Sequence, residues 1–571
     1  MNVADFFVEL LLREGVTHVF TVPGGTALPL MHALSKASDI RTVVCKDELG
    51  ASFMADGYAW SSGKPGVIVT IGGPGATNTT TGLCCSNAQG NPVVLVSGEV
   101  TTSSLGRRAA QDGSALGIDV TAISRPATGL STSVASASDA VTGLEEAFRR
   151  AMHQRKPVHI SIPLDVQRAS VPDSARRRPR APCPEVRTMS PAGVRRAALL
   201  LGQEGRKVAF LLGRGASDAR AEVLALAERL GAPVATTCGA KGLFPERHPL
   251  ALGVFSFGGG PLGRAVMTGD LDVLVAIGTG LGEFATMNYS QRLNPKIALI
   301  HVDKDPSVFG RSYASVPVCG DAQEVCRALL GELTTSQNRQ LPAWYAALKA
   351  KLGRVAEPEM LTASTLPIRP ERLMHEIEAV LPEDACVVAD IGTSCLFVAH
   401  CLRISQPQRC YIPMVWSCMG HPLGAALGVR LGSRCPTICI AGDAAFLSQG
   451  LELHAAVEQK VENFVWVVLS NGGHGLVRMG TEGILGKGHG VEDGSFAFTP
   501  NIAAIAQAVG AAALTVKHPG ELRAALEHGF SCGGPCVIDV HVDPVARPPM
   551  AERIQGLGEA TEAGAAARLS A

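Results

Sequence analysis

Two apolar runs, residues 437–441 and 464–469, lie on either side of a segment in which apolar residues recur with helical spacing. Runs of this length that are rich in Val and Ile are typical of buried strands in a parallel sheet. A strand, a helix and a second strand form one right-handed crossover unit, and both connecting loops emerge at the same edge of the sheet. Asp443 and Asn471, one in each loop, are therefore expected to lie side by side although they are distant in sequence.

These two loops carry groups that suit a metal-bound phosphate. The carboxylate of Asp443, the amide oxygen of Asn471 and a free backbone carbonyl in the same pair of loops suit a hard octahedral cation such as Mg2+. The glycines beside them let the backbone approach a phosphate closely. The alternative is an ordinary strand, turn and helix of an α/β protein, because a Gly-Asp-Ala turn on its own is common.

The chain is too long for a single hydrophobic core. Its 571 residues predict three or four domains, and 46% hydrophobic against 18% charged residues indicates a compact globular enzyme. The 51 basic and 51 acidic residues balance each other. This balance gives no electrostatic reason to expect nucleic acid or an anionic membrane as a partner.

The 16 cysteines are scattered through apolar segments without paired Cys-x-x-Cys spacing. Buried reduced thiols in a cytosolic protein account for them better than disulfides or a zinc site. The N-terminal segment carries Asp5 and Glu9 and is expected to form an amphipathic helix, not a signal peptide. No apolar run is long enough to span a bilayer, so a cytoplasmic location is predicted.

Strands alternate with helices along most of the chain, which predicts α/β domains with doubly wound parallel sheets. The strands expected in the first two domains are residues 16–22, 43–45, 66–71, 93–97, 158–162, 208–212, 233–236, 273–277 and 298–302. The predicted organisation is a first domain (1–167), a linker (168–190), a central domain (191–335), a linker (336–366), a third domain (367–545) and a tail (546–571). The tail lacks an apolar face and is expected to pack loosely.

The central domain opens with a loop that superficially resembles a dinucleotide-binding loop. Gly213-Arg214-Gly215 follows the first predicted strand of this domain, but Asp218 stands where the fingerprint has its third glycine. A structural Rossmann-like domain is the preferred interpretation, and nucleotide binding is the alternative.

Motifs in the first domain match one family independently of the metal loops. Residues 73–78 read Gly-Pro-Gly-Ala-Thr-Asn, and Lys46-Asp47-Glu48 precedes Met-Ala-Asp-Gly-Tyr-Ala at 54–59. Across nearly its whole length the chain resembles the thiamine diphosphate (ThDP)-dependent 2-oxo acid decarboxylase and acetolactate synthase family. The resemblance implies a pyrimidine-binding domain, a central Rossmann-like domain and a diphosphate-binding domain, in that order.

The resemblance assigns catalytic roles to three residues of the first domain. Glu48 matches the glutamate that hydrogen-bonds the aminopyrimidine of ThDP and thereby promotes removal of the thiazolium C2 proton. The alternative for Glu48 is an acid that complements a helix dipole. Gly25 ends the first loop in its acetolactate synthase form. Gln111 is expected to face the substrate, although Ala110 replaces an aromatic residue, and the alternative is an exposed loop glutamine.

In the third domain the resemblance identifies residues 442–475 as the ThDP signature, with Asp443, Asn471 and Gly473 as metal ligands. Met419 matches the apolar residue that supports the bent cofactor, a proximity effect, and its alternative is a core position. His474 is either a cofactor contact or a surface-loop histidine. The full set of predicted cofactor residues is Pro23, Glu48, Pro74, Asn78, Gly392, Thr393, Ser394, Met419, Gly442, Asp443, Ala444, Ala445, Asn471, Gly473, His474 and Gly475.

The chain departs from acetolactate synthases at three places. Leu164 replaces a lysine near the substrate entrance, and Gly480 replaces the tryptophan associated with the second 2-oxo acid. The acceptor pocket must therefore differ, and Arg478 and Met479 are the candidate substrate residues there. Residues 280–284 replace the Arg-Phe-Asp segment near flavin, which argues against FAD.

The resulting hypothesis is a ThDP- and Mg2+-dependent enzyme that decarboxylates a 2-oxo acid and transfers the acyl carbanion to a second carbonyl. Simple decarboxylation to an aldehyde is the alternative, and a non-catalytic ThDP-fold subunit is a third reading. Small-molecule 2-oxo acids are the expected partners. Glu48 and Asp443 lie in domains that meet across a subunit interface in this family, so a homo-oligomer is expected that is at least a dimer, either a homodimer or a homotetramer.

Overall fold

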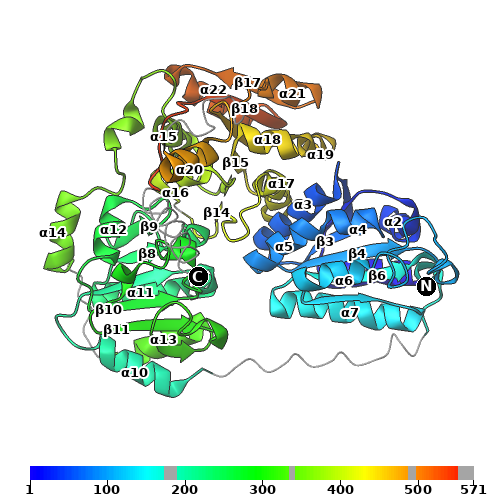
Figure 1. Cartoon of the computed structure of the whole chain (residues 1–571), viewed down its shortest axis with the longest axis horizontal. Helices are drawn as coiled ribbons and strands as arrows, with labels where there is room; N and C mark the ends of the chain where they lie inside the picture. Colours follow the sequence, from blue (N-terminus) through cyan, green and yellow to red (C-terminus); the bar gives the residue numbers. More distant parts are fainter. Residues whose placement is uncertain (173–188, 334–340, 405, 487–496, 551–571) are drawn as a thin grey trace, which may run out of the picture.

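The computed structural model contains three six-stranded parallel sheets, which follow one another along the chain (Figure 1). It describes residues 1–172, 189–333, 341–404, 406–486 and 497–550. In these residues every pair of neighbouring named strands is parallel. The prediction of an α/β protein with three doubly wound sheets is confirmed.

The sheet of the first domain has the strand order β2-β1-β3-β4-β6-β5. The elements are α1 (Val3–Arg13), β1 (His18–Thr21), α2 (Leu28–Ser35), β2 (Arg41–Val44), α3 (Glu48–Ser62), β3 (Gly66–Ile71), α4 (Pro74–Asn78), α5 (Thr80–Gln89), β4 (Val93–Glu99), α6 (Val120–Ser124), β5 (Leu130–Ser133), α7 (Ala137–Gln154), β6 (Val158–Pro163) and α8 (Leu164–Arg168). The order reverses between β1 and β3, and a ligand crevice is expected beyond the carboxyl ends of these two strands.

The central sheet has the order β12-β11-β10-β7-β8-β9, which is the order of a dinucleotide-binding Rossmann fold. The elements are α10 (Pro191–Leu201), β7 (Val208–Leu212), α11 (Arg220–Leu230), β8 (Val234–Thr236), β9 (Ala251–Val254), α12 (Pro261–Met267), β10 (Val273–Ile277), β11 (Ala298–Asp303), β12 (Val316–Cys319) and α13 (Ala322–Glu332), and α14 (Ala343–Lys351) follows.

The third sheet has the order β14-β13-β15-β16-β18-β17, which repeats the topology of the first. The elements are α15 (Pro370–Val380), β13 (Cys386–Ala389), α16 (Thr393–Cys401), β14 (Cys410–Tyr411), α17 (His421–Ser433), β15 (Thr437–Gly442), α18 (Asp443–Gln449), α19 (Leu453–Glu458), β16 (Phe464–Ser470), α20 (Gly475–Leu485), α21 (Ile502–Ala508), β17 (Ala512–Val516), α22 (Leu522–Ser531) and β18 (Pro535–His541). In this sheet the order reverses between β13 and β15. Helices α3 and α17 occupy equivalent positions, each after the second strand of its sheet.

The predicted strands match long central strands and the edge strand β2, whereas four other short strands at the sheet edges were missed. β5, β9, β12 and β14 contain two to four residues each, and all four lie at an edge. An edge strand pairs on one side only, so it does not need the continuous apolar run that identifies a central parallel strand. β5, for example, reads Leu-Ser-Thr-Ser.

The first and third domains pack against each other through α3 and α17, which lie side by side in Figure 1. The two helices run parallel, because Gly424 faces Phe53 near one end while Gly432 faces Ser61 near the other. Apolar side chains of both domains continue this contact as one buried cluster. The N-termini of the two helices therefore lie at the same end of the pair.

Glycines allow the backbones of α3 and α17 to touch. A Cβ atom on Gly57 would lie 2.0 Å from the carbonyl oxygen of Ala425, and one on Gly428 would lie 1.9 Å from the carbonyl oxygen of Met54. No side chain fits at such distances from a backbone atom. Close approach of the helices therefore depends on glycine at these positions.

A buried polar network joins all three domains beside this helix pair. Asp56 of α3, fully buried, accepts hydrogen bonds from Asn91 Nδ2 at 2.9 Å and from the Tyr411 hydroxyl, and contacts His421 Nε2 at 2.9 Å. Burial opposes ionisation of Asp56, but His421 and the two donors hold its pKa below the usual value. Arg214 of the central domain donates to two carbonyl oxygens at the end of α5.

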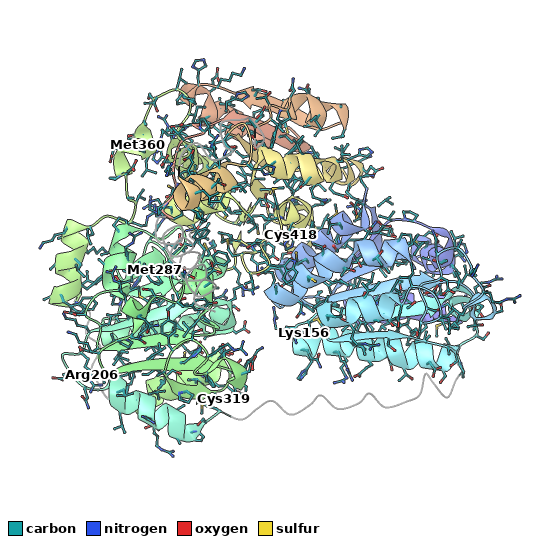
Figure 2. The ribbon with its side chains drawn as sticks, in the orientation of Figure 1. Lys156, Arg206, Met287, Cys319, Met360 and Cys418 are labelled. Carbon is teal, nitrogen blue, oxygen red and sulfur yellow. The ribbon has the colours of Figure 1, made fainter. Side chains whose placement is uncertain are left out.

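Two thiols meet across the same junction. Cys418 precedes α17 in the third domain and is labelled in Figure 2, where the third domain approaches the first. Its interaction with the Cys85 thiol of α5, together with the charge of His421, lowers the pKa of Cys418 to about 7 against the opposing effect of burial. All fifteen cysteines in the described residues are free thiols.

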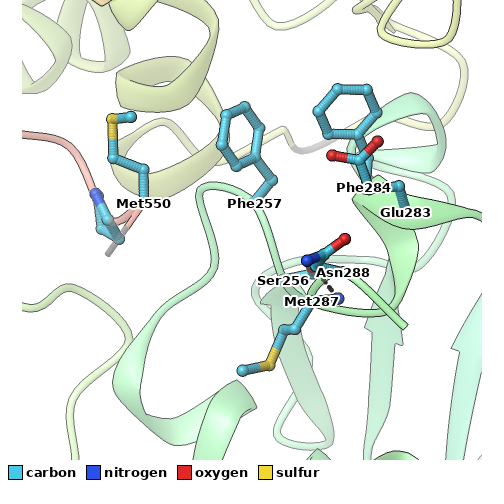
Figure 3. A pocket seen from close by; sticks show the side chains of 8 residues that line it. Ser256, Phe257, Glu283, Phe284, Met287, Asn288 and Met550 are labelled. Atoms are coloured by element: carbon cyan, nitrogen blue, oxygen red, sulfur yellow. Dashed lines mark hydrogen bonds between the residues drawn. The ribbon is translucent and has the colours of Figure 1, made fainter. Parts of the chain in front are cut away.

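The prediction of a loosely packed tail is wrong for residues 546–550, and residues 551–571 lie outside the described part. Ala546 and Met550 are buried in the core of the third domain. Figure 3 shows Met550 near Phe257 of the central domain, around a small cavity of about 20 Å3, and Pro549 accepts a hydrogen bond from the Gly258 N–H at 3.2 Å. Ala546 and Met550 anchor the segment, although no periodic apolar pattern in the sequence predicts their burial.

No helix in the described segments is both long enough and apolar enough to cross a membrane.

We expect Gly428→Ala to destabilise the protein by about 1–3 kcal/mol, because the added methyl group forces α3 and α17 apart. Gly331→Ala in α13 is the matched control, since a Cβ there meets nothing within 4 Å. The control should be neutral or more stable by about 0.5–1 kcal/mol. Thermal unfolding of the two variants measures the difference, and an unchanged Tm for Gly428→Ala would contradict the packing argument.

Candidate active site

In the first domain, the loops after β1 and β3 meet where the strand order reverses. A Cβ on Gly24 would lie 2.3 Å from Ile71 Cγ2, so the two loops are in contact. The loop that carries Gln111 completes this edge, because a Cβ on Gly73 would lie 3.2 Å from the Cα of Gln111. Gln111 itself is exposed and has a left-handed backbone with φ of 67°.

Glu48 joins this group of loops from the neighbouring strand. It is the first residue of α3, follows β2 and is half-buried. Its Oε2 accepts a hydrogen bond from Asn78 Nδ2 at 3.0 Å, and a Cβ on Gly75 would lie 3.3 Å from its Oε1. The structure thus brings Glu48 against residues 73–78, although the two motifs are separate in the sequence. The predicted residues Pro23, Gly25, Pro74 and Asn78 are exposed along the same edge.

A carboxylate of the third domain holds the turn that precedes Glu48. Glu452, which is buried, accepts hydrogen bonds from the backbone N–H of Lys46 at 3.1 Å and of Asp47 at 3.0 Å. Burial raises the pKa of Glu452 to about 7, opposed by these two donors. Glu452 was missed in the sequence, because its partners belong to another domain.

The metal loops of the third domain lie together as expected. Strands β15 and β16 are neighbours, with Gly442 opposite Leu469. Asp443, only 1% exposed, accepts hydrogen bonds from the N–H of Ala444 at 2.8 Å, Gly472 at 2.9 Å and Gly473 at 3.3 Å. Burial raises the pKa of Asp443, and the N–H donors oppose the shift. A divalent cation at this carboxylate would favour the ionised form.

The side-chain amide oxygen of Asn471 is available to a ligand. Its Oδ1 is buried and has no hydrogen-bond partner among the described residues. A Cβ on Gly475 would lie 2.5 Å from Asn471 Nδ2, so glycine at 475 makes room for this amide. An orphaned amide oxygen beside a buried carboxylate is the donor set that a hard cation completes. No group of three His, Cys, Asp or Glu side chains within the described residues offers an alternative metal site.

Across the switch point, Asp390 supports the turn that carries Met419. Asp390 is fully buried; its Oδ1 accepts the Gly420 N–H at 3.0 Å, and its Oδ2 has no partner in the described residues. Burial raises the pKa of Asp390 to about 8, against the effect of the N–H donors. Gly420 has φ of 83°, which favours glycine, and Met419 is 38% exposed. Met419 is thus held outside the core.

The remaining predicted residues of the third domain divide into two groups. Gly392, Thr393, Gly442 and Ala444 are partly exposed around the switch point, and Ala445 is buried beneath them. Ser394 is buried, and its hydroxyl donates to the carbonyl oxygen of Asp390 at 2.9 Å. Its hydroxyl therefore serves the loop itself.

The residues predicted to contact the acceptor have structural partners. Met479 is 3% exposed and belongs to the core of the third domain. The Arg478 guanidinium donates to the carbonyl oxygen of Pro544. His474 stacks edge-on against Phe498, with ring centroids 5.4 Å apart. The structure does not bring Arg478 or Met479 together with Glu48 or Gln111 through any hydrogen bond within the described residues.

The two domains together offer what ThDP requires. The third domain supplies a carboxylate, an orphaned amide oxygen and glycine loops for a metal-bound diphosphate. The first supplies a carboxylate next to a glycine-rich loop for the aminopyrimidine. Open space surrounds the Cβ positions of Gly25 and Gly442, so a ligand can approach both backbones. The residues present therefore fit this cofactor.

Comparison with known protein families agrees with this assignment. Models of the thiamine pyrophosphate enzymes match the chain as the N-terminal TPP-binding domain over residues 1–123, the central domain over 194–329 and the C-terminal TPP-binding domain over 390–540.

Relatives cover the chain almost completely. A putative acetolactate synthase large subunit of Mycobacterium tuberculosis is 30% identical over 566 residues, covering 96% of this chain and 99% of the relative. The large subunit of acetolactate synthase isozyme 1 of Escherichia coli is 28% identical and covers 97% of each chain. A probable 2-ketoarginine decarboxylase of Pseudomonas aeruginosa is 32% identical, covering 95% of this chain and 94% of the relative.

The fold and both halves of the site define a ThDP-dependent enzyme. The chain belongs to the thiamine diphosphate enzyme family and is similar to the large subunits of acetolactate synthases.

Asp443→Asn should weaken Mg2+ activation by at least tenfold, because the variant lacks the anionic ligand. The concentration of Mg2+ that gives half-maximal ThDP binding, followed after removal of metal with EDTA, measures the effect. Asp303→Asn is the control: Asp303 also ends a parallel strand and accepts a backbone N–H, from Asp305 at 2.9 Å, but lies in the central domain. Equal Mg2+ requirements in both variants would exclude Asp443 as a ligand.

Proposed function

We propose that the protein is a ThDP- and Mg2+-dependent carboligase that decarboxylates a 2-oxo acid and transfers the acyl group to a second carbonyl compound. The observation that carries this proposal is the retention of both site halves: Glu48 against the 73–78 loop, and Asp443 with the orphaned oxygen of Asn471. Several relatives bear the name acetolactate synthase, which supports carboligation.

ThDP, when bound, supplies the electron sink that decarboxylation of a 2-oxo acid needs. The chain's own residues hold and orient the reactants. Glu48 would hold the aminopyrimidine and could exchange a proton with it, and Asn78 orients the Glu48 carboxylate through its hydrogen bond at 3.0 Å. Asp443, Asn471 and the Gly473 carbonyl, which also accepts the Gly475 N–H at 2.9 Å, would hold Mg2+. Met419 supports the cofactor from the turn that Asp390 fixes, and Gln111 lies over the glycine loop, where a substrate would enter.

Simple decarboxylation is the second candidate. It is favoured by the relative named as a probable 2-ketoarginine decarboxylase, which is as similar to this chain as the acetolactate synthases. Both reactions begin with loss of CO2 and differ in whether a carbonyl acceptor or a proton takes up the acyl group. The third reading, a non-catalytic subunit, requires that Glu48 and the metal loops have been kept without use.

We propose that two copies of the chain form each active site. Within one chain no hydrogen bond or ion pair between described residues links Glu48 to the metal loops. Large apolar side chains next to both site halves are exposed, which is costly for a monomer. They are Val44, Trp416, Met419, Leu447 and Leu451. A homodimer would cover them and join the two halves.

We propose that the central domain is structural and holds no FAD. A cavity of about 490 Å3 lies at the switch point of its sheet, beside Gly213 and Gly278. Among the described residues that line it, Arg214 is the one basic residue, and its guanidinium donates to carbonyl oxygens at the end of α5. Glu283 adds a carboxylate to the lining, which disfavours a dinucleotide phosphate.

The free thiols of the described residues support the predicted cytoplasmic location, which remains part of this proposal.

The wild-type enzyme with ThDP and Mg2+ should release CO2 from at least one member of a panel of 2-oxo acids and form a coupled hydroxy-ketone product when a second carbonyl is present. Glu48→Gln should lower turnover at least a hundredfold, because the amide cannot exchange the proton. ThDP affinity should change much less, since the diphosphate contacts are intact. CO2 release and product analysis by mass spectrometry measure these effects.

Aldehyde as the sole product would favour simple decarboxylation. Equal inactivity of wild type and Glu48→Gln, with ThDP bound to both, would overturn the assignment as an enzyme.

Mixed oligomers test the shared site. Glu48→Gln and Asp443→Asn are each expected to be inactive, but a mixed dimer regains one intact site from the first domain of one chain and the third domain of the other. When the two variants assemble at random, about half of the dimers are mixed, and each mixed dimer has one intact site of two. About a quarter of wild-type turnover should therefore be restored. Complementation is measured after co-expression of the two variants with different affinity tags. Absence of any recovery in purified mixed dimers would place both residues in the site of one chain.

A further inference from the structure

The first and third domains form a cleft at the edge opposite to the cofactor loops. It lies at the amino ends of β1, β2 and β16 and at the C-terminus of α17, and its volume is about 510 Å3. A cavity of this size accommodates a metabolite. Both domains contribute to its walls, so an occupant would bridge them.

Basic side chains dominate this cleft. Arg41, Arg430, Arg434 and Lys460 line it, against the two carboxylates of Asp39 and Glu462. The whole chain is electrically neutral, so this excess of positive charge is a local feature. Within the described residues, no ion pair joins Arg41, Arg434 or Lys460 to a carboxylate. We call this group the basic cleft.

The positive charges converge on one histidine. His18 begins β1, and its Nδ1 lies 2.9 Å from the Thr17 hydroxyl. Burial, followed by the charges of Arg41 and Arg434, lowers the pKa of His18 to about 4. Arg41 comes from the first domain and Arg434 from the third, so two guanidinium groups from different domains act on the same point. An anion between them would relieve their repulsion.

The walls of the cleft are fixed by backbone contacts between elements. Arg430 Nε donates to the carbonyl oxygen of Glu462 at 3.0 Å, and Gln459 Nε2 donates to the carbonyl oxygen of Thr42 at 3.4 Å. The second contact joins the third domain to the first. These bonds hold Arg430 beside the cleft and leave the guanidinium groups of Arg41 and Arg434 available to a ligand.

Complementing the dipole at the end of α17 explains only part of the cluster. Arg430 and Arg434 stand where the helix C-terminus favours positive charge. Arg41 begins a strand of the other domain, and Lys460 lies in the loop after α19, so neither belongs to that helix. Four cations from three segments, facing one cavity, are the arrangement that binds phosphate through forked guanidinium contacts.

We propose that the basic cleft binds a small phosphorylated molecule with a diphosphate group, which bridges the first and third domains. The site is distinct from the cofactor site, because it lies at the amino ends of the strands while the cofactor loops follow the carboxyl ends. The ligand holds together the domain pair that carries Glu48 and Met419, so its binding stabilises the α3–α17 contact. The proposal depends on the structure alone and not on which 2-oxo acid the enzyme uses.

Calorimetric titration of ADP and of inorganic pyrophosphate into the holoenzyme, saturated with ThDP and Mg2+, tests the proposal. Saturation with ThDP prevents pyrophosphate from entering the cofactor site. We expect Arg41→Gln combined with Arg434→Asn to weaken binding at least tenfold, since two charge-assisted contacts are lost. Asn suits position 434, where φ is 61°. Binding should also weaken as salt concentration rises.

Arg196→Gln, at an exposed position on α10, is the matched control and should bind as wild type does. Turnover without ligand should be unchanged in all these variants, because none lies at the cofactor edge. If the double variant has a lower Tm than wild type, Lys460→Gln alone provides the comparison and should weaken binding severalfold. Tighter binding of ADP than of pyrophosphate would identify a nucleotide as the ligand class, and equal binding would identify the diphosphate group itself.

Two results would overturn the proposal. One is no measurable binding of either probe to the wild-type holoenzyme at millimolar concentration. The other is equal affinity in wild type and in the variants of the basic cleft, which would place the ligand elsewhere, for example in the central cavity.

Discussion

Backbone contact between α3 and α17 is the constraint on which the arrangement of this enzyme depends. Gly57 and Gly428 bring the two helices so close that carbonyl oxygens occupy the space of the missing side chains. Because the helices run parallel, the contact also sets the first domain against the third in one orientation. The network around Asp56 then adds directional hydrogen bonds, and Arg214 ties the central domain to the same place.

Each half of the cofactor site depends on groups outside its own loop. Glu452 of the third domain holds the backbone that leads into Glu48, and Asp390 holds the turn of Met419. Both carboxylates are buried, and burial raises the pKa of each. Their hydrogen bonds to backbone N–H groups fix the position of the residues proposed to contact the cofactor, which is how a rigid scaffold keeps a site preorganised.

Parts of the candidate site that depend on a local sequence motif could be predicted from the sequence. The spacing of Asp443 and Asn471 predicted that the two would meet, and the 73–78 loop meets Glu48 as its motif implies. Contacts between distant segments could not be predicted, because nothing in the sequence near Glu452 or Asp390 indicates which backbone N–H groups each carboxylate accepts. Met550 shows the same limit, because a single apolar residue in a Pro- and Gly-rich segment has no period to reveal its burial. The edge strands β5, β9, β12 and β14 were missed because one-sided pairing leaves little apolar signal.

The identical strand order of the first and third sheets places two of the proposed site residues at equivalent positions. Glu48 opens the helix after the second strand of one sheet, and Met419 stands just before the helix after the second strand of the other. The proposed acid and the proposed cofactor support thus occupy equivalent positions in two sheets of the same topology. One architecture, present twice in the chain, thereby offers two different side chains at the same structural position.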